Sequence, residues 1–138
     1  MKILVSKCLL GCNCRYDGKN CLNEKVVALQ KDNEVIAICP EVEGGLPTPR
    51  QPGERVNDKV MAKNGADVTN EYMKGAQIAL EIAKKEKIDL AVLKSKSPSC
   101  GTGLIYDGTF TGGKIPGNGV TSELLQNNGF KVITEEDL

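Results

Sequence analysis

The sequence contains no histidine among its 138 residues. This absence excludes a zinc site built on imidazole, a Cys–His nucleophilic pair and a histidine general base. Any acid–base chemistry at neutral pH must therefore use another side chain, and we expect a carboxylate.

Aromatic residues are scarce, at 4% of the chain, and tryptophan is absent. An extended platform for stacking single-stranded nucleic acid is therefore not expected. The 18 Lys and Arg residues balance the 18 Asp and Glu residues, so no global charge attracts a polynucleotide or a membrane surface. We expect a small-molecule partner, with nucleic acid an unfavoured alternative.

Long apolar runs are missing as well. No segment approaches the roughly 18 apolar residues of a membrane span, and the apolar stretch at the amino terminus is too short for a signal peptide. We expect a cytoplasmic protein without a membrane partner. In that reducing compartment the six cysteines indicate metal binding, catalysis or burial in preference to disulfides.

Three cysteines follow short apolar runs that are typical of buried strands. Cys8, Cys39 and Cys100 stand one to seven residues beyond the runs 3–5, 35–38 and 90–93, respectively. Because parallel strands end at the same edge of a sheet, these thiols can meet there. The pattern predicts a metal or cluster site.

The other three cysteines crowd the first loop, and their spacing matches neither the ferredoxin nor the zinc-ribbon pattern. They are Cys12, Cys14 and Cys21. Their roles stay open between metal binding and burial as small hydrophobic residues.

The order of elements predicts an α/β fold: one three-layer, Rossmann-like domain over residues 1–138 with a mostly parallel sheet of about four strands. Residues 40–65 contain so many Pro and Gly that we expect an irregular loop there, with a regular element at most at its end. The Gly-rich segment 101–119 predicts a small hairpin with strands at 105–106 and 109–110. The expected helices and last strand are 22–30, 70–86, 116–126 and 130–133.

The segment after Cys39 carries candidate catalytic groups. Glu41 is the carboxylate best placed for proton transfer. Arg50 can donate two parallel hydrogen bonds to one acceptor group. Gly44 allows the main chain to approach a ligand closely. The alternative is a proline-stiffened loop with solvated carboxylates, which we favour for Glu43.

Two further loops offer polar side chains. Arg15 and Asp17 precede a turn glycine and are either binding groups or solvated turn residues. Ser97 and Ser99 supply hydroxyls near Cys100, whose pKa we expect the neighbouring Lys94 and Lys96 to lower. The helix start at 119–121 offers free N–H groups to an anion or a polar substrate edge, unless it is an ordinary cap.

Taken together, these segments resemble the thiouracil desulfurase family. The resemblance covers nearly the whole chain, because several separate blocks occur in the right order. The blocks are VSKCLLG at 5–11, CRYDG at 14–18, CPEV at 39–42 with GGLPTPR at 44–50, KSKSPSCG at 94–101 and GVT at 119–121.

The resemblance implies an oxygen-sensitive [4Fe–4S] cluster held by three cysteines, which map to Cys8, Cys39 and Cys100, with one iron left open. The thiocarbonyl sulfur of a thiopyrimidine would bind that iron, water would replace sulfur on the carbon, and sulfide would leave without net electron transfer. Our own hypothesis is that Glu41 shuttles protons and that Ser97 or Ser99 hydrogen-bonds the ring, with Glu41 and Ser97 as the catalytic residues. The expected substrate-binding residues are Arg15, Asp17, Gly44, Arg50 and Ser99.

Two alternatives remain at this point. One is an iron–sulfur module that carries sulfur or senses redox state without turning over thiobases. The other is a structural zinc protein that uses the crowded cysteines of the first loop.

Overall fold

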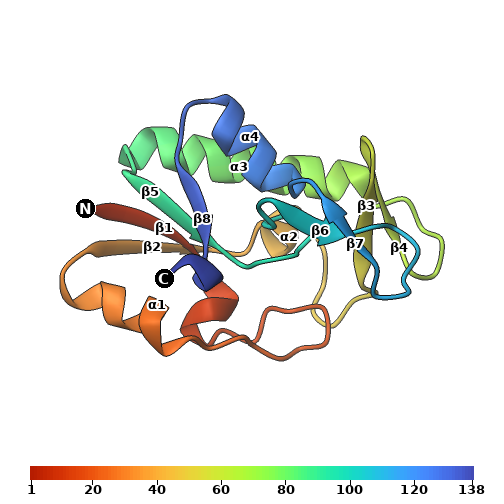
Figure 1. The fold of residues 1–138 in the computed structure, drawn as a ribbon, viewed down its shortest axis with the longest axis horizontal. Helices are drawn as coiled ribbons and strands as arrows, with labels where there is room; N and C mark the ends of the chain where they lie inside the picture. Colours follow the sequence, from red (N-terminus) through yellow and green to blue (C-terminus); the bar gives the residue numbers. More distant parts are fainter.

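The computed structural model describes residues 1–138, and its centre is a parallel sheet of four strands (Figure 1). The strand order is β2-β1-β5-β8, and every neighbouring pair is parallel. The predicted α/β class and parallel sheet are confirmed. The strands are β1 (Lys2–Ser6), β2 (Glu34–Ile38), β5 (Leu90–Leu93) and β8 (Val132–Thr134).

Helices cover both faces of this sheet. The longer helices α3 (Thr69–Glu86) and α4 (Val120–Asn127) lie on one face, and α1 (Glu24–Ala28) lies on the other (Figure 1). Along β1, Leu4 packs into the cluster under α3 and α4, whereas Ile3 and Val5 pack into the cluster with α1. Because successive strand side chains point to opposite faces, one apolar run fills two core layers.

Helix α3 matches the predicted helix closely. Most of its apolar positions recur at helical spacing and are buried, with Met73 the exposed exception. The last turn carries Lys84 and Lys85, which complement the helix dipole. The helix ends at Glu86 and is capped by Lys87, which adopts a left-handed conformation with φ of 53°. No helix in the structure has the length and apolar character that crossing a membrane requires.

The segment predicted to be irregular contains two regular elements. A short helix α2 (Pro40–Glu43) begins directly after Cys39, because Pro40 is compatible with a first helical turn. A hairpin of β3 (Gly53–Val56) and β4 (Lys59–Ala62) follows. The expectation was wrong there, because the Pro and Gly residues are concentrated before β3 and a two-residue turn with Asn57 at φ 54° suffices to reverse the chain.

The Gly-rich hairpin is present, but its second strand lies later than predicted. The strands are β6 (Leu104–Tyr106) and β7 (Lys114–Pro116), and residues 107–113 form the loop between them. Phe110 has φ of 58° and so cannot continue a strand. As a consequence α4 begins at Val120, not at 116.

The first predicted helix is shorter than expected and changes type. Asn23 caps α1 with its side chain, and after Ala28 the chain tightens into the 3₁₀ turn η2 (Leu29–Lys31).

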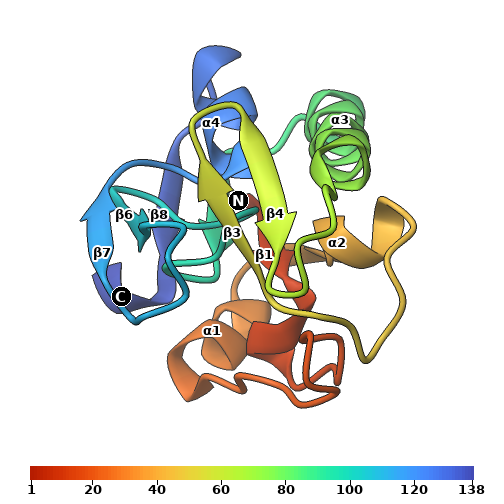
Figure 2. The ribbon, with the colours of Figure 1, turned by 90° about the vertical axis from the view of Figure 1, so that its right-hand side faces the viewer.

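Both hairpins lie beyond the carboxyl edge of the sheet, with α1 below and α3 and α4 above (Figure 2). This edge is therefore where loops from distant parts of the sequence meet.

Candidate active site

A pocket of about 480 Å³ lies at the carboxyl edge of the sheet. This volume lies within the range of small-molecule and cofactor sites. Segments that follow β1, β2 and β5 line it together with both hairpins. Its lining includes Cys8, Cys39 and Cys100, as well as Arg15, Glu41, Arg50, Tyr72 and Ser97.

The three thiols reach this pocket from three strand ends, as the sequence predicts. Cys8 lies on the 3₁₀ turn η1 (Lys7–Leu10) directly after β1, and Cys39 caps α2 directly after β2. Cys100 closes the loop that leaves β5. All three are free thiols. The pocket therefore offers three sulfur atoms that can bind a metal.

Nowhere do three His, Cys, Asp or Glu side chains lie close enough together to hold a single metal ion. A zinc ion with Zn–S bonds of ~2.3 Å needs its ligand sulfurs roughly 4 Å apart. The crowded first loop thus provides no arrangement for the zinc alternative. A polynuclear cluster spreads its ligands more widely, since each thiolate binds a different iron.

Burial controls the acidity of the two thiols deepest in the pocket. Desolvation raises the pKa of Cys8 well above its usual range and raises the pKa of Cys100 to about 12, although Ser6 and Ser99 hydrogen-bond to Cys100. The expectation that neighbouring lysines lower the pKa of Cys100 was wrong, because Lys94 and Lys96 turn to Glu135 and Glu136. A metal centre that these thiols bound as thiolates would therefore have to displace their protons.

Cys14 is a buried pocket residue whose role the sequence left open. Its contact with Cys39 lowers the pKa of Cys39 and raises that of Cys14. The Cys39 thiol also lies 3.8 Å from the carbonyl oxygen of Cys14. By contrast, Cys12 is exposed, and Cys21 accepts a hydrogen bond of 3.0 Å from Arg15 Nη1.

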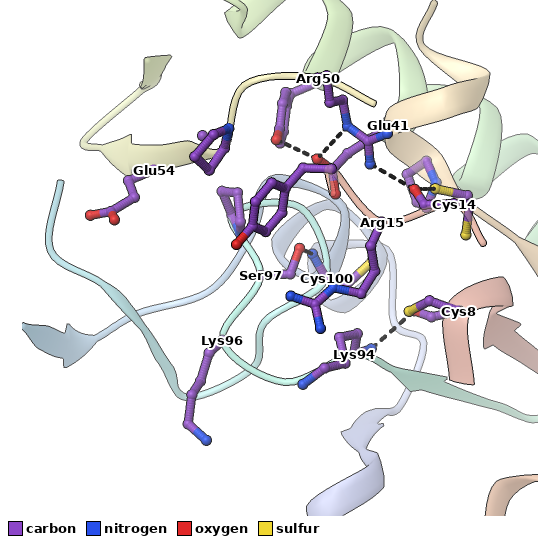
Figure 3. A pocket seen from close by; sticks show the side chains of 18 of the residues that line it. Cys8, Cys14, Arg15, Glu41, Arg50, Glu54, Lys94, Lys96, Ser97 and Cys100 are labelled. Atoms are coloured by element: carbon purple, nitrogen blue, oxygen red, sulfur yellow. Dashed lines mark hydrogen bonds and ion pairs between the residues drawn. The ribbon is translucent and has the colours of Figure 1, made fainter. Parts of the chain in front are cut away.

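Glu41 lies on α2 and faces the pocket (Figure 3). The Tyr72 hydroxyl donates a hydrogen bond of 2.5 Å to Glu41 Oε1, and Arg50 Nε lies 3.4 Å from the same oxygen. Tyr72 lies in the first turn of α3, on the buried face of the helix, and was not among the predicted site residues.

Arg50 also lines the pocket, but its guanidinium is occupied by the protein itself. Nη1 donates to Pro47 O and Thr48 Oγ1, each at 3.1 Å, and Nη2 donates to Cys14 O at 2.9 Å. With its side chain 5% exposed, Arg50 joins α2, the loop before β3 and the first cysteine loop.

Ser97 and Ser99 have different surroundings. Ser97 lines the pocket, and its Oγ accepts hydrogen bonds of 3.0 Å from the backbone N–H groups of Ser99 and Cys100. These two donors polarise the hydroxyl, which keeps its own proton for a further acceptor. Ser99 is fully buried outside the pocket and shares a 2.8 Å hydrogen bond with Thr121.

Two other predicted binding residues also lie outside the pocket lining. Asp17 accepts a hydrogen bond from Lys19 N within its own turn and lies 3.6 Å from Arg15 Nε. Gly44 does permit a close backbone approach, but to α3, where an added Cβ would lie 1.9 Å from Glu71 O. Arg15, in contrast, extends toward the middle of the pocket (Figure 3).

The amino terminus of α4 does not offer the predicted free donors. Val120 N donates to Pro98 O, and Thr121 N donates to Ser99 O, each at 2.8 Å. The helix start therefore supports the loop that carries Ser97 and Cys100. Its N–H groups are used in these contacts and are not free to bind an anion.

Basic side chains outnumber acidic ones in the pocket lining, although four of the six are paired with carboxylates. Two acidic side chains line it, Glu41 and Glu54, and Glu54 points away from the cysteines (Figure 3). An anionic centre or product is stabilised in such surroundings. The six basic side chains in the lining are Lys7, Arg15, Arg50, Lys63, Lys94 and Lys96.

This thiol-rich, basic pocket at the edge of a parallel sheet has a counterpart among known enzymes. The model of a family described as 2-thiouracil desulfurase matches residues 3–137. The chain belongs to the 2-thiouracil desulfurase family and is thus an enzyme of the class that cleaves carbon–sulfur bonds.

Two individual proteins are similar over almost their whole length. The solved structure of the [4Fe-4S]-dependent thiouracil desulfidase TudS is 45% identical, with a TM-score of 0.94, and the match covers 99% of this chain and 92% of that one. The uncharacterized protein YbbK of Bacillus subtilis (strain 168) is 43% identical over 146 residues, which cover 99% of this chain and 97% of YbbK.

Proposed function

We propose that this protein removes sulfur from thiouracil-type thiopyrimidines with a [4Fe–4S] cluster bound by Cys8, Cys39 and Cys100. The observation that carries the proposal is that three free thiols from three strand ends line one pocket. Membership of the 2-thiouracil desulfurase family and the similarity to TudS support it.

The donor set fits an iron–sulfur cluster. Thiolates are the ligands of such clusters, and three of them leave one iron of a four-iron cluster without a protein ligand. When bound, the cluster supplies an iron that acts as a Lewis acid toward the soft thiocarbonyl sulfur. The other pocket residues have to position the base and move protons.

The reaction exchanges sulfur for oxygen at one ring carbon. The carbon–sulfur bond of the thiocarbonyl breaks, a carbon–oxygen bond to a water oxygen forms, and both protons of that water leave with sulfur as hydrogen sulfide. Thiouracil and water thus give uracil and hydrogen sulfide, and no atom is oxidised or reduced.

Glu41 is the group that takes the proton from water. Its Oε1 is engaged by Tyr72 and Arg50, whereas Oε2 has no hydrogen bond within the protein. A carboxylate oxygen in a pocket without histidine is the base that the chain provides at neutral pH.

Ser97 is placed to donate a hydrogen bond to the ring. Two backbone amides already donate to its oxygen, so the hydroxyl proton is left to donate to another acceptor. Among the basic side chains that line the pocket, Lys7 and Lys63 form no ion pair within the protein, and they stabilise the negative charge that builds up on sulfur as it leaves. A pocket of about 480 Å³ suits a free base or nucleoside more than a polynucleotide.

The test is anaerobic reconstitution with iron and sulfide, followed by incubation with 2-thiouracil and quantification of uracil and sulfide. We expect equal amounts of both products from the reconstituted protein and none from the iron-free protein. A protein that binds iron but turns over no thiopyrimidine in a panel would contradict the proposal and favour the alternative of a sulfur-carrier or redox-sensing module.

A pair of variants on α2 tests the role of the carboxylate. Glu41→Gln should retain iron and keep only a small residual turnover, because the amide cannot accept the proton. Glu43→Gln is the matched control, since Glu43 is an exposed residue of the same helix outside the pocket. Full activity in Glu41→Gln would remove Glu41 from the mechanism.

A further inference from the structure

The Tyr72 hydroxyl is buried among apolar side chains and has one partner. Tyr72 is 2% exposed and packs with Val60, Ala76 and Val120. Its hydroxyl donates to Glu41 Oε1 at 2.5 Å across 31 residues of sequence. Burial, reinforced by the Glu41 charge, raises the pKa of Tyr72 far above its usual range, so the hydroxyl keeps its proton and acts as a donor.

Both donors to Glu41 approach the same oxygen. Arg50 Nε lies 3.4 Å from Oε1, and no hydrogen bond or ion pair of the protein involves Oε2. Arg50 is itself fixed by three further hydrogen bonds to backbone and side-chain oxygens. Two anchored donors on one oxygen fix the rotation of the carboxylate and leave the other oxygen available in the pocket.

The helix contact explains why a tyrosine of α3 reaches a carboxylate of α2. A Cβ on Gly44 would lie 1.9 Å from Glu71 O, and a Cβ on Gly75 would lie 1.9 Å from Pro40 O. Each glycine comes three residues after the side chain concerned, Glu41 on α2 and Tyr72 on α3. Residues three apart share a helix face, so the backbone contact brings these two side chains together.

We propose that Tyr72 and Arg50 are positioning residues that hold Glu41 Oε1 so that Oε2 is presented to the reacting water. The effect that we expect on catalytic activity rests on the proposed function. Arg50, which the sequence analysis expected to bind substrate, is thus proposed to support the catalytic carboxylate.

The experiment compares Tyr72→Phe with Thr69→Val. Both variants remove a hydroxyl from α3, but the Thr69 hydroxyl oxygen accepts a hydrogen bond of 2.9 Å from Val60 N and lies outside the pocket. In anaerobically reconstituted protein we expect Tyr72→Phe to bind iron like the wild type and to keep KM within about threefold. Its kcat should fall by about 10–100-fold, because small misplacements of a catalytic group have effects of this order. Thr69→Val should keep the wild-type kcat.

Two readouts separate positioning from a general loss of structure. In the Glu41→Gln background, Tyr72→Phe should lower the residual kcat by less than about twofold, because the two residues act through one carboxylate. In a crystal structure of the iron-free Tyr72→Phe protein, the Glu41 carboxylate should rotate away from its wild-type orientation or occupy more than one.

Failures of the two proposals are distinguishable. If the wild type turns over no thiopyrimidine, the proposed function fails, and the Glu41 orientation in the iron-free variant still decides the positioning role. If Tyr72→Phe keeps full kcat, or if its effect is equally large in the Glu41→Gln background, or if Glu41 keeps a single wild-type orientation without the hydroxyl, the inference is overturned.

Discussion

The carboxylate of Glu135 accepts two hydrogen bonds from Ser95, one of 2.7 Å from the backbone N–H and one of 3.0 Å from the hydroxyl. Glu135 begins the final 3₁₀ turn η3 (Glu135–Asp137), which Thr134 caps. Lys94 Nζ lies 3.2 Å from the same carboxylate. The end of the chain thus fixes the loop that carries Ser97 and Cys100, so the last turn belongs to the support of the pocket.

Glu135→Ala should destabilise the protein and weaken iron binding. The variant leaves the Ser95 N–H and hydroxyl without their partner, and an unpaired buried polar group costs about 1–3 kcal/mol. Chemical denaturation gives the free energy of unfolding, and iron analysis after gel filtration gives the retained cluster.

Glu136→Ala is the matched control for this prediction. Its side chain is 56% exposed and pairs with Lys96 at 3.3 Å. An exposed pair of this kind contributes less than about 1 kcal/mol. Equal effects of the two variants on stability and iron content would contradict a special role for Glu135.

Gly75→Ala should push α2 away from α3. The new Cβ would fall 1.9 Å from Pro40 O, and such overpacking costs about 1–3 kcal/mol. Because α2 carries Glu41 and begins at Cys39, we expect the iron content and turnover to fall together with the melting temperature. The control is Met73→Ala, since Met73 is 52% exposed on the same helix and surface changes stay within about 0.5 kcal/mol. A Gly75→Ala protein with normal iron content and activity would show that the close contact does not position the site.

Alanine variants of the two serines should separate catalysis from stability. Ser97→Ala removes the hydroxyl that we assign to the ring, and loss of one such donor lowers kcat by about 10²–10³-fold. Ser99→Ala removes a buried hydroxyl bonded to Thr121 and should mainly lower the free energy of unfolding, by about 1 kcal/mol. Steady-state kinetics and thermal unfolding of both variants measure the difference. The reverse pattern would restore Ser99 as a substrate-binding residue.

Arg50→Lys tests whether Arg50 supports the protein or binds substrate. A lysine ammonium cannot reproduce the fork that bonds Pro47 O, Thr48 Oγ1 and Cys14 O. We expect a lower melting temperature and a lower kcat with little change in KM. A selective rise in KM at unchanged stability would show that Arg50 contacts substrate.

The sequence predicted the gathering of Cys8, Cys39 and Cys100 because strand ends are readable from apolar runs. Parallel strands share one edge, so loops 31 and 61 residues apart in sequence had to meet there. For the same reason it could be predicted that a carboxylate and a serine in these loops reach the same pocket. Glu41 and Ser97 both line the pocket.

Tyr72 was not predicted because it comes from a helix, and its position on α3 is typical of a core residue. Its hydrogen bond to Glu41 depends on the backbone contact at Gly44 and Gly75. A glycine in a sequence indicates that something approaches closely, but not whether that is a ligand or another helix. This is why Gly44 was assigned to substrate binding while it packs against α3.

The boundaries of the hairpins were also beyond the sequence pattern. Glu54 Oε1 accepts hydrogen bonds from Gly108 N at 2.9 Å and Phe110 N at 3.2 Å, which hold the loop of one hairpin against the other. The residues joined by these two hydrogen bonds are 54 and 56 positions apart in the sequence. Such a long-range contact overrides the local β-propensity of Thr109 and Phe110. Local signals therefore located a hairpin but not its second strand.

The iron content of cysteine variants after anaerobic reconstitution tests the three cluster ligands most directly. The wild type should bind about four iron atoms per chain. We expect Cys8→Ala, Cys39→Ala and Cys100→Ala each to lose most of this iron, whereas Cys12→Ala, in which an exposed thiol is removed, should bind as much as the wild type. Full iron binding in any of the first three variants would contradict the assignment of these thiols as the cluster ligands.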